Sequence, residues 1–279
     1  MTVQRPTFLA RLTASVDEHG PLCVGIDPHP VLLAAWGAGA DASALERFGR
    51  SVVEAAAGRV GVVKPQVALF EAHGAAGLAA LERVLADARQ AGLVVLADAK
   101  RGDIGSTNAG YAAAWLTPGS PLEADALTVS PYLGVGALEP LFAAAEAGGK
   151  GLFVLAATSN PEAAALQLAR LPDGRTVAAS VADAVVERNA RTGAGHGLVI
   201  GATIDRAAYG LEPHASTPVL APGFGAQGAR LADLHALFPP GALVLASASR
   251  SILDAGPSGL AEAIDAARGE LPPSAGEGR

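Results

Sequence analysis

The stretch Leu93–Asp103, LVVLADAKRGD, joins a continuous apolar run to a charged end. Its first six residues do not alternate between polar and apolar, which is typical of a parallel strand covered on both faces. Seven other runs along the chain share this character. The full set is Leu22–Asp27, Val60–Lys64, Leu93–Asp98, Ala124–Ser130, Leu152–Thr158, Leu198–Thr203, Val219–Pro222 and Leu243–Ser247.

Ala-rich segments of helical period lie between these runs; examples are Ala42–Gly58, Ala75–Ala91, Gly136–Ala147, Thr176–Arg191 and Gly228–Phe238. Eight strand–helix alternations predict an α/β fold, a single (β/α)8 TIM barrel with eight parallel strands. A doubly wound open sheet is the alternative. We expect one domain over residues 1–268, with a short N-terminal helix from about Thr7, and a flexible polar tail over residues 269–279.

Composition excludes several classes of protein. With 20 basic and 27 acidic residues, the net charge of −7 lacks the basic footprint of a nucleic-acid-binding protein. No apolar run reaches the ~18 residues of a membrane span, and the N-terminus lacks the apolar core of a signal peptide. Cys23 is the single cysteine, so an intrachain disulfide is impossible and we expect a cytoplasmic protein.

Lysine is rare in this chain. Only three of the 20 basic residues are lysines, Lys64, Lys100 and Lys150, and the others are arginines. Because arginine never gives up its proton, a lysine that persists within an apolar run points to ammonium chemistry.

The sharpest motif is Asp98-x-Lys100-x-x-Asp103, at a predicted strand end where TIM barrels place their active sites. Residues two apart in a strand face the same side, so Asp98 and Lys100 should point together into the barrel mouth. Lys64, at the end of the preceding strand, would complete an alternating array of charges. Such an array suits a reaction that forms and then protonates a carbanion; the alternative is a salt-bridge network that closes the barrel top.

A second motif, PGFGAQG at Pro222–Gly228, follows the seventh predicted strand. Gly-rich loops let backbone N–H groups approach a phosphate, and in barrels the phosphate commonly binds after strands 7 and 8. The expected contacts come from Pro222, Gly223, Gly225 and Gln227, with Arg250 as a clamp after the eighth strand. The alternative is an ordinary turn that uses glycine for positive φ.

Other polar residues give weaker signals. Asp27 either binds a ribose hydroxyl or caps a helix. Ser130 and Ser159 either touch a polar ring or are small core residues. His29, His73 and His196 lack metal-ligand spacing, so we expect no zinc or iron site. Asp and Glu alone would still suffice for Mg2+.

Together these motifs resemble the orotidine 5'-phosphate decarboxylase family, and in particular its longer bacterial subgroup, type 2. The resemblance runs from about Leu22 to Leu253 and rests on GIDPHP, VVKPQ, LADAKRGDIGST, TVSPYLG, FVLAATSNP and PGFGAQG. It implies a TIM barrel that removes CO2 from orotidine 5'-monophosphate to give UMP, the last step of de novo pyrimidine synthesis, without a metal or organic cofactor.

The resemblance also implies roles for individual residues. The family's Lys-Asp-Lys-Asp array maps onto Lys64, Asp98, Lys100 and Asp103, with Lys100 as the proton donor to C6. Asp98 would lie against the substrate carboxylate, and Asp27 and Lys64 near the ribose. Ser159 matches the serine that reads the pyrimidine, and Gln227 and Arg250 match the phosphate contacts. In the family's homodimer, residues matching Asp103 and Thr107 reach into the partner's site.

Three features depart from the family pattern. Ser249 precedes Arg250 where many members have glycine, Asn160 stands where many have histidine, and the segment Pro161–Gly197 is long. Two other functions remain open. One is a Mg2+-dependent sugar-phosphate decarboxylase or aldolase of the same superfamily, which carries a carboxylate where this chain has Lys64. The other is a non-catalytic nucleotide-binding barrel.

Overall fold

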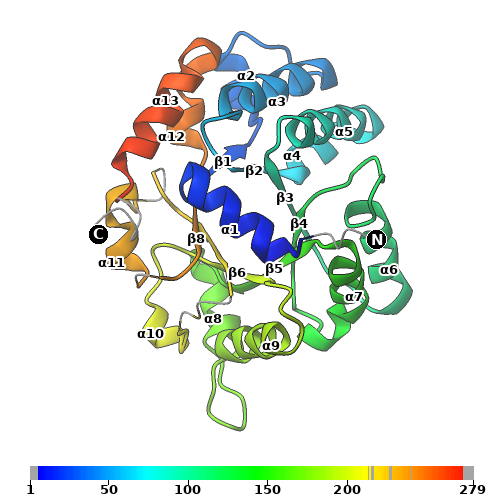
Figure 1. The fold of residues 1–279 in the computed structure, drawn as a ribbon, viewed down its shortest axis with the longest axis vertical. Helices are drawn as coiled ribbons and strands as arrows, with labels where there is room; N and C mark the ends of the chain where they lie inside the picture. Colours follow the sequence, from blue (N-terminus) through cyan, green and yellow to red (C-terminus); the bar gives the residue numbers. More distant parts are fainter. Residues whose placement is uncertain (1–5, 213, 215–216, 226–227, 240, 273–279) are drawn as a thin grey trace.

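Eight parallel strands close into a barrel in the order of the sequence, and β8 pairs with β1 (Figure 1). This computed structural model describes residues 6–212, 214, 217–225, 228–239 and 241–272. The predicted TIM barrel is confirmed, and the open doubly wound sheet is excluded. The strands are β1 (Leu22–Ile26), β2 (Val62–Pro65), β3 (Val94–Arg101), β4 (Ala126–Val129), β5 (Gly151–Ala157), β6 (Gly197–Ile200), β7 (Val219–Pro222) and β8 (Val244–Ala248).

Helices surround the barrel, as Figure 1 shows. The longer ones are α1 (Phe8–His19), α3 (Ala42–Ala56), α5 (Gly74–Gln90), α6 (Gly105–Trp115), α7 (Glu139–Gly148), α9 (Val177–Thr192) and α13 (Gly256–Glu270). Shorter ones are α2 (Pro30–Ala35), α4 (Val67–Glu71), α8 (Ala164–Gln167), α10 (Arg206–Tyr209), α11 (Leu234–Leu237) and α12 (Arg250–Leu253). Three 3-10 turns complete the set, η1 (Val135–Leu138), η2 (Pro161–Ala163) and η3 (Leu231–Asp233).

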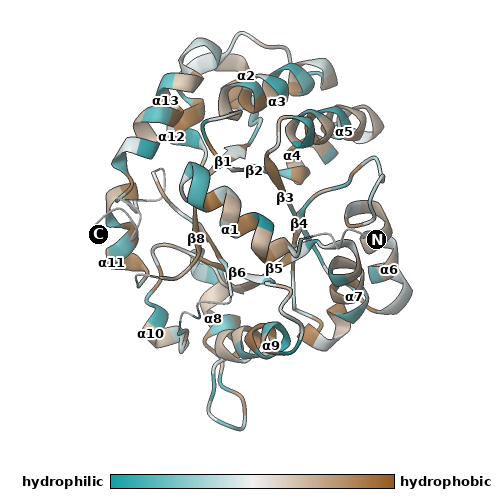
Figure 2. Cartoon of the chain, in the orientation of Figure 1, coloured by the Kyte–Doolittle hydropathy of each residue, from teal (hydrophilic) through white to brown (hydrophobic). Residues whose placement is uncertain are grey.

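The continuously apolar strands are buried on both faces. One apolar cluster fills the barrel, and a larger one lies between the strands and the outer helices. In Figure 2, β3 and β8 are brown, whereas the surrounding helices show teal hydrophilic patches. Burial on both faces explains why these strands carry no polar alternation.

Helix α1 closes the N-terminal end of the barrel, which is the end opposite the strand termini that carry the polar motifs. Thr7 caps the helix by accepting a hydrogen bond from the N–H of Ala10, as the expected start near Thr7 requires. Phe8 and Leu12 belong to the interior cluster, and the Phe8 ring meets Phe153 edge-on at 6.1 Å. Arg11 pairs with Asp125 at 2.7 Å, just before β4.

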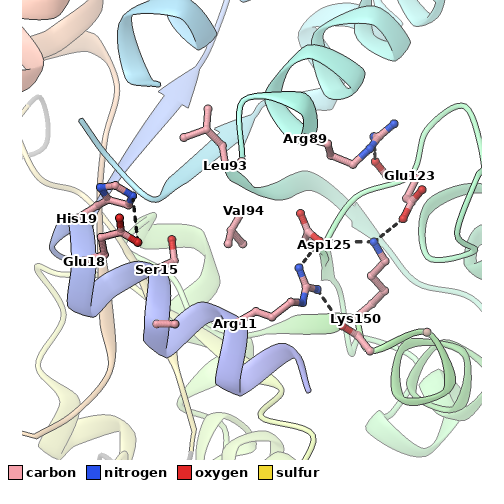
Figure 3. Close-up of a pocket in the computed structure, with 14 residues that line it drawn as sticks. Arg11, Ser15, Glu18, His19, Arg89, Leu93, Val94, Glu123, Asp125 and Lys150 are labelled. Carbon is pink, nitrogen blue, oxygen red and sulfur yellow. Dashed lines mark hydrogen bonds and ion pairs between the residues drawn. The ribbon is translucent and has the colours of Figure 1, made fainter. Parts of the chain in front are cut away.

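A charged pocket of about 550 Å3 lies beside α1 on this floor of the barrel (Figure 3). Lys150 is 4% exposed there and pairs with Glu123 at 2.7 Å and Asp125 at 3.5 Å. Its ammonium is therefore committed to two carboxylates far from the motifs at the mouth. Because lysine is rare, the sequence singles out Lys150 as strongly as Lys64 and Lys100. Only the fold shows that Lys150 lies far from the other two.

The long segment Pro161–Gly197 forms η2, α8, a short antiparallel bridge between Arg170 and Thr176, and α9. The loop between the bridge residues projects away from the barrel below α9 (Figure 1). At the other end of the chain, α13 extends to Glu270, and residues 273–279 of the expected tail lie outside the described residues. None of the helices in the described part of the chain is long and apolar enough to cross a membrane.

Candidate active site

Three predicted charges meet at the carboxyl ends of β2 and β3. The Asp98 carboxylate lies between two ammonium groups, with Oδ2 at 3.1 Å from Lys64 Nζ and Oδ1 at 2.6 Å from Lys100 Nζ. The side chains of Lys64 and Asp98 are 7% and 10% exposed, whereas that of Lys100 is 47% exposed. The prediction that Asp98 and Lys100 point together is confirmed by this geometry.

The backbone that carries Lys100 is not a regular strand. Ala97 pairs with Leu127 and Arg101 with Val129, so three residues of β3 stand against the single residue Thr128 of β4. Lys100 has φ of 49°, and it is the one non-glycine with positive φ among the described residues. This left-handed conformation costs about 1–3 kcal/mol and persists only where the surroundings enforce it. Strand alternation therefore correctly predicted the contact between Asp98 and Lys100. It did not predict the irregular backbone on which that contact depends.

The charges shift one another's pKa values. Burial alone would raise the pKa of Asp98, but the ammonium groups of Lys64 and Lys100 outweigh it and lower that pKa to about 2. Burial likewise favours the neutral amine of Lys64, yet the carboxylates of Asp98 and Asp27 outweigh it and raise the Lys64 pKa. Both groups therefore remain ionised at neutral pH.

A cavity of about 280 Å3 opens beside this network, and Lys64 and Asp98 line it whereas Lys100 does not. Its polar lining includes Asp27, and Asp27 Oδ1 is buried without a hydrogen-bond partner among the described residues. A buried carboxylate oxygen without a donor is costly, so this atom is suited to a ligand hydroxyl. The lining residues are Asp27, His29, Leu32, Lys64, Gln66, Asp98, Pro222, Gly223, Phe224, Ser247, Ser249, Arg250 and Leu253.

The loop after β7 has the backbone that its glycines predict. Gly223 and Gly225 have φ of 118° and 76°, and the N–H of Gly225 donates to the carbonyl of Ala229 at 2.9 Å. Arg250 is exposed, begins α12 and lines the cavity beside Pro222 and Gly223. The structure thus brings the two expected parts of a phosphate site together, while Gln227 lies outside the described residues.

Ser249 fits without the glycine that many family members have there. Its φ of −132° needs no glycine. Its side chain instead lies over Gly25 of β1, where a Cβ would come within 1.8 Å of Ser249 Oγ. Gly25 thus provides the space that the Ser249 side chain occupies.

Asp103 and Thr107 lie apart from the network. Asp103 Oδ1 accepts from the N–H of Ile104 at 2.8 Å, and within the described part of the chain the Asp103 carboxylate forms no ion pair. Thr107 is exposed on α6, and both residues are absent from the cavity lining. Ile104, Tyr132 and Leu133 expose 62%, 75% and 53% of their surface on the loops after β3 and β4.

Ser159 follows β5, is exposed and is not among the residues that line the cavity. The adjacent Thr158 Oγ1 donates to Asn160 Oδ1 at 2.7 Å, and the N–H of Thr158 donates to Gln167 Oε1 at 2.9 Å. Asn160 is therefore part of the polar turn that leads from β5 into η2.

Sequence reasoning missed several residues at the mouth. Thr128 donates to Asp98 Oδ1 and accepts from the N–H of Lys100, each at 2.9 Å, and Gln66 and Ser247 line the cavity. A signal was available, because Thr128 and Ser247 lie in the carboxyl-terminal halves of predicted strands and Gln66 follows another predicted strand by two residues. Thr128 and Ser247, however, stand within continuous apolar runs and carry no charge.

In the described part of the chain, no three or more His, Cys, Asp and Glu side chains gather in a way that would hold a metal ion. The candidate site is instead built on two ammonium groups around one carboxylate.

Comparisons with known proteins agree with this geometry. The Orotidine 5'-phosphate decarboxylase / HUMPS family model matches residues 20–264. An orotidine 5'-phosphate decarboxylase from Salinispora tropica is 55% identical, over 91% of this chain and 92% of the relative.

Solved structures extend the likeness to three dimensions. A Streptomyces avermitilis protein, described with its crystal structure as a candidate orotidine 5'-phosphate decarboxylase, is 48% identical with a TM-score of 0.91, covering 96% of each chain. The Leishmania donovani OMP decarboxylase is 30% identical with a TM-score of 0.73, covering 94% of this chain and 98% of that one. The chain therefore belongs to the orotidine 5'-phosphate decarboxylase family.

Proposed function

We propose that this chain catalyses the decarboxylation of orotidine 5'-monophosphate to UMP and CO2, with no metal or organic cofactor, as the last step of de novo UMP synthesis. The observation that carries the proposal is the Lys64–Asp98–Lys100 network at the mouth of a barrel of this family. The named activity of the Salinispora tropica relative supports it.

In the proposed reaction, the bond between C6 of the pyrimidine and its carboxylate breaks and CO2 leaves. The electron pair stays on C6 as a carbanion, and Lys100 Nζ donates the proton that replaces the carboxylate. Asp98 lies against the substrate carboxylate. The contact of 2.6 Å between Lys100 Nζ and Asp98 Oδ1 supports these roles, because it holds the donor beside the group that the carboxylate would meet.

Two electrostatic effects contribute to the proposed rate: repulsion between Asp98 and the substrate carboxylate, and stabilisation of the carbanion by the ammonium groups. Two unit charges ~4 Å apart at an effective dielectric of ~20 interact by about 4 kcal/mol, so repulsion by Asp98 is worth at most about a thousandfold in rate. Lys64 and Lys100 offset that repulsion, since the three groups together carry one net positive charge. Stabilisation of the carbanion by the ammonium groups is therefore the larger contribution.

The remaining proposed contacts are to the ribose, the pyrimidine and the phosphate of the nucleotide. Asp27, with its unpartnered buried oxygen, and Lys64 bind the ribose. Ser159 reads the pyrimidine. Arg250, Gln227 and the backbone of the β7 loop at Pro222, Gly223 and Gly225 bind the phosphate, and the positive φ values of the two glycines support a backbone contact.

The proposed enzyme is a homodimer in which Asp103 and Thr107 complete the partner's site. Two observations support this arrangement. Neither side chain lines its own chain's cavity or pairs with the Lys64–Asp98–Lys100 network, and Ile104, Tyr132 and Leu133, on the loops after β3 and β4, expose large apolar surfaces. We also propose a cytoplasmic location, which the lone buried thiol of Cys23 supports.

The family description also covers relatives whose reaction uses Mg2+ and a sugar phosphate. Lys64 disfavours that chemistry here. Its ammonium pairs with Asp98 at the position where those relatives carry a carboxylate ligand, so a cation already neutralises Asp98.

The test is the loss of orotate absorbance when purified protein meets orotidine 5'-monophosphate in EDTA. Rapid loss supports the proposal. Inertness in EDTA together with turnover of a sugar phosphate in Mg2+ would assign the chain to the metal-dependent relatives. Inertness under both conditions would leave a barrel that binds nucleotides without catalysis.

A further inference from the structure

Thr128 contacts both Asp98 and Lys100 of β3 through one hydroxyl. Its Oγ1 lies 2.9 Å from Asp98 Oδ1 and 2.9 Å from the N atom of Lys100. A backbone N–H only donates, so Oγ1 accepts from Lys100, and its single proton must point at Asp98. Thr128 is 1% exposed, so water does not compete for either bond.

The same hydroxyl accepts a hydrogen bond from a backbone N–H that has no regular partner in the sheet. Residues 98–100 stand against Thr128 alone, because the register shifts between Ala97 and Arg101. Such a bulge leaves the extra residues without regular ladder partners. Thr128 Oγ1 takes the N–H of Lys100, the residue with φ of 49°. The side chain of β4 thus supports the one left-handed non-glycine in the described part of the chain.

We infer that Thr128 is a positioning residue for the decarboxylation, which rests on the function proposed above. It does not line the cavity and acts through its neighbours. It fixes the plane of the Asp98 carboxylate between Lys64 and Lys100, and it holds the backbone that aims Lys100 Nζ. Its loss should therefore weaken the chemical step and leave phosphate and ribose contacts intact.

The test compares Thr128→Val, which keeps the shape and removes the hydroxyl, with Thr128→Ser, which keeps the hydroxyl. For Thr128→Val we expect kcat to fall about 10- to 100-fold, the effect of one hydrogen bond to a charged group. KM and the affinity for UMP should change less than about threefold, and Thr128→Ser should recover most of kcat.

Thr217→Val is the matched control. Thr217 is also buried, at 2% exposed, and its hydroxyl accepts from Asn189 at 3.0 Å, away from the catalytic network. The Thr217→Val enzyme should lose thermal stability but keep the wild-type kcat. A Thr128→Val enzyme with wild-type kcat, or one whose kcat does not recover in Thr128→Ser, would overturn the inference.

Urea unfolding gives a readout that needs no turnover. Thr128→Val and Asp98→Asn, measured singly and together, should be non-additive because the two side chains share a hydrogen bond. If the wild type fails to turn over orotidine 5'-monophosphate, the proposed function fails. In that case additive unfolding midpoints would also overturn the positioning role, and coupled midpoints would support the contact.

Discussion

Both carboxylate oxygens of Asp98 are engaged by donors, Oδ2 by Lys64 and Oδ1 by Lys100 and Thr128. An ionised carboxylate only accepts hydrogen bonds, so this set of donors matches the ionised form and its low pKa of about 2. The residue therefore keeps two ammonium groups close together, that of the buried Lys64 and that of the half-exposed Lys100. That concentration of positive charge suits an anionic substrate and a developing carbanion.

His196 is a buried titratable residue outside the site. It is fully buried between β5 and α7, where the N–H of Leu152 donates to its Nδ1 at 3.2 Å. Burial lowers the pKa of His196 to about 4, and the opposing effect of Glu146 is smaller. The folded chain therefore holds a neutral imidazole at pH 7.

This lowered pKa predicts a loss of stability in acid. The unfolded chain, with a histidine pKa near 6.5, binds the proton more readily than the folded chain. The free energy of unfolding should therefore fall as pH drops from 7 to 4, by about 3 kcal/mol from this residue. Urea unfolding should show a smaller pH dependence in His196→Gln, and an unchanged pH dependence in that variant would contradict the prediction.

At the scale of elements, the site is built on the ends of β1, β2, β3, β7 and β8 and on the loops that follow them. Helix α12 has only four residues, and its first residue, Arg250, faces the cavity next to the β7 loop. In the function proposed above, the phosphate binds at this loop, away from the reacting carbon. Phosphate contacts can therefore contribute to rate by closing the loop over the site.

Arg250→Ala should lower kcat as well as raise KM, with kcat/KM falling about 100- to 1,000-fold, the effect of a charge-assisted bidentate contact. Steady-state kinetics with orotidine 5'-monophosphate measures both parameters. Arg230→Ala is the control, because Arg230 is exposed and pairs with Asp233 at 2.7 Å. A rise in KM with kcat untouched would show that the phosphate contact contributes binding alone.

Much of this arrangement is predictable from sequence. Lys64 and Asp98 were found because charged residues that end apolar runs mark the mouth of a barrel. The strand ranges hold to within about three residues, since burial on both faces leaves a strong apolar signal.

The bulge in β3 was not predictable from the same pattern. It depends on the register of β3 against β4 and on the hydroxyl of Thr128, neither of which alters hydropathy. The direction of Asp103 was also open, because it lies past the strand, where the two-residue period no longer applies.

At the scale of the whole molecule, the two ends of the barrel carry different sets of charged residues. Those at the floor hold the fold together, and those at the mouth form the candidate active site. The floor holds α1 in place through Arg11, Asp125 and Lys150, all paired (Figure 3). The mouth holds Lys64, Asp98 and Lys100 beside a cavity, with exposed apolar residues near Asp103. This asymmetry is typical of TIM barrels, where one end supplies stability and the other the chemistry.

The proposed dimer predicts complementation between inactive variants. If Asp103 acts in the partner's site, Lys100→Ala and Asp103→Ala chains should each be nearly inactive alone. A mixed dimer then contains one fully wild-type site, so random exchange of subunits should restore about a quarter of wild-type activity. Mixing after mild unfolding and refolding measures this recovery. The absence of recovery, with mixed dimers verified by a tag, would place Asp103 in its own chain's site.

The most direct test of the central claim is the rate of orotidine 5'-monophosphate decarboxylation by Lys100→Ala beside the wild type, in EDTA, with UMP binding measured for both. We predict rapid loss of orotate absorbance with the wild type. The variant should bind UMP nearly as well yet decarboxylate too slowly to detect in the same assay. A Lys100→Ala enzyme with substantial turnover would contradict the assignment of Lys100 as the proton donor.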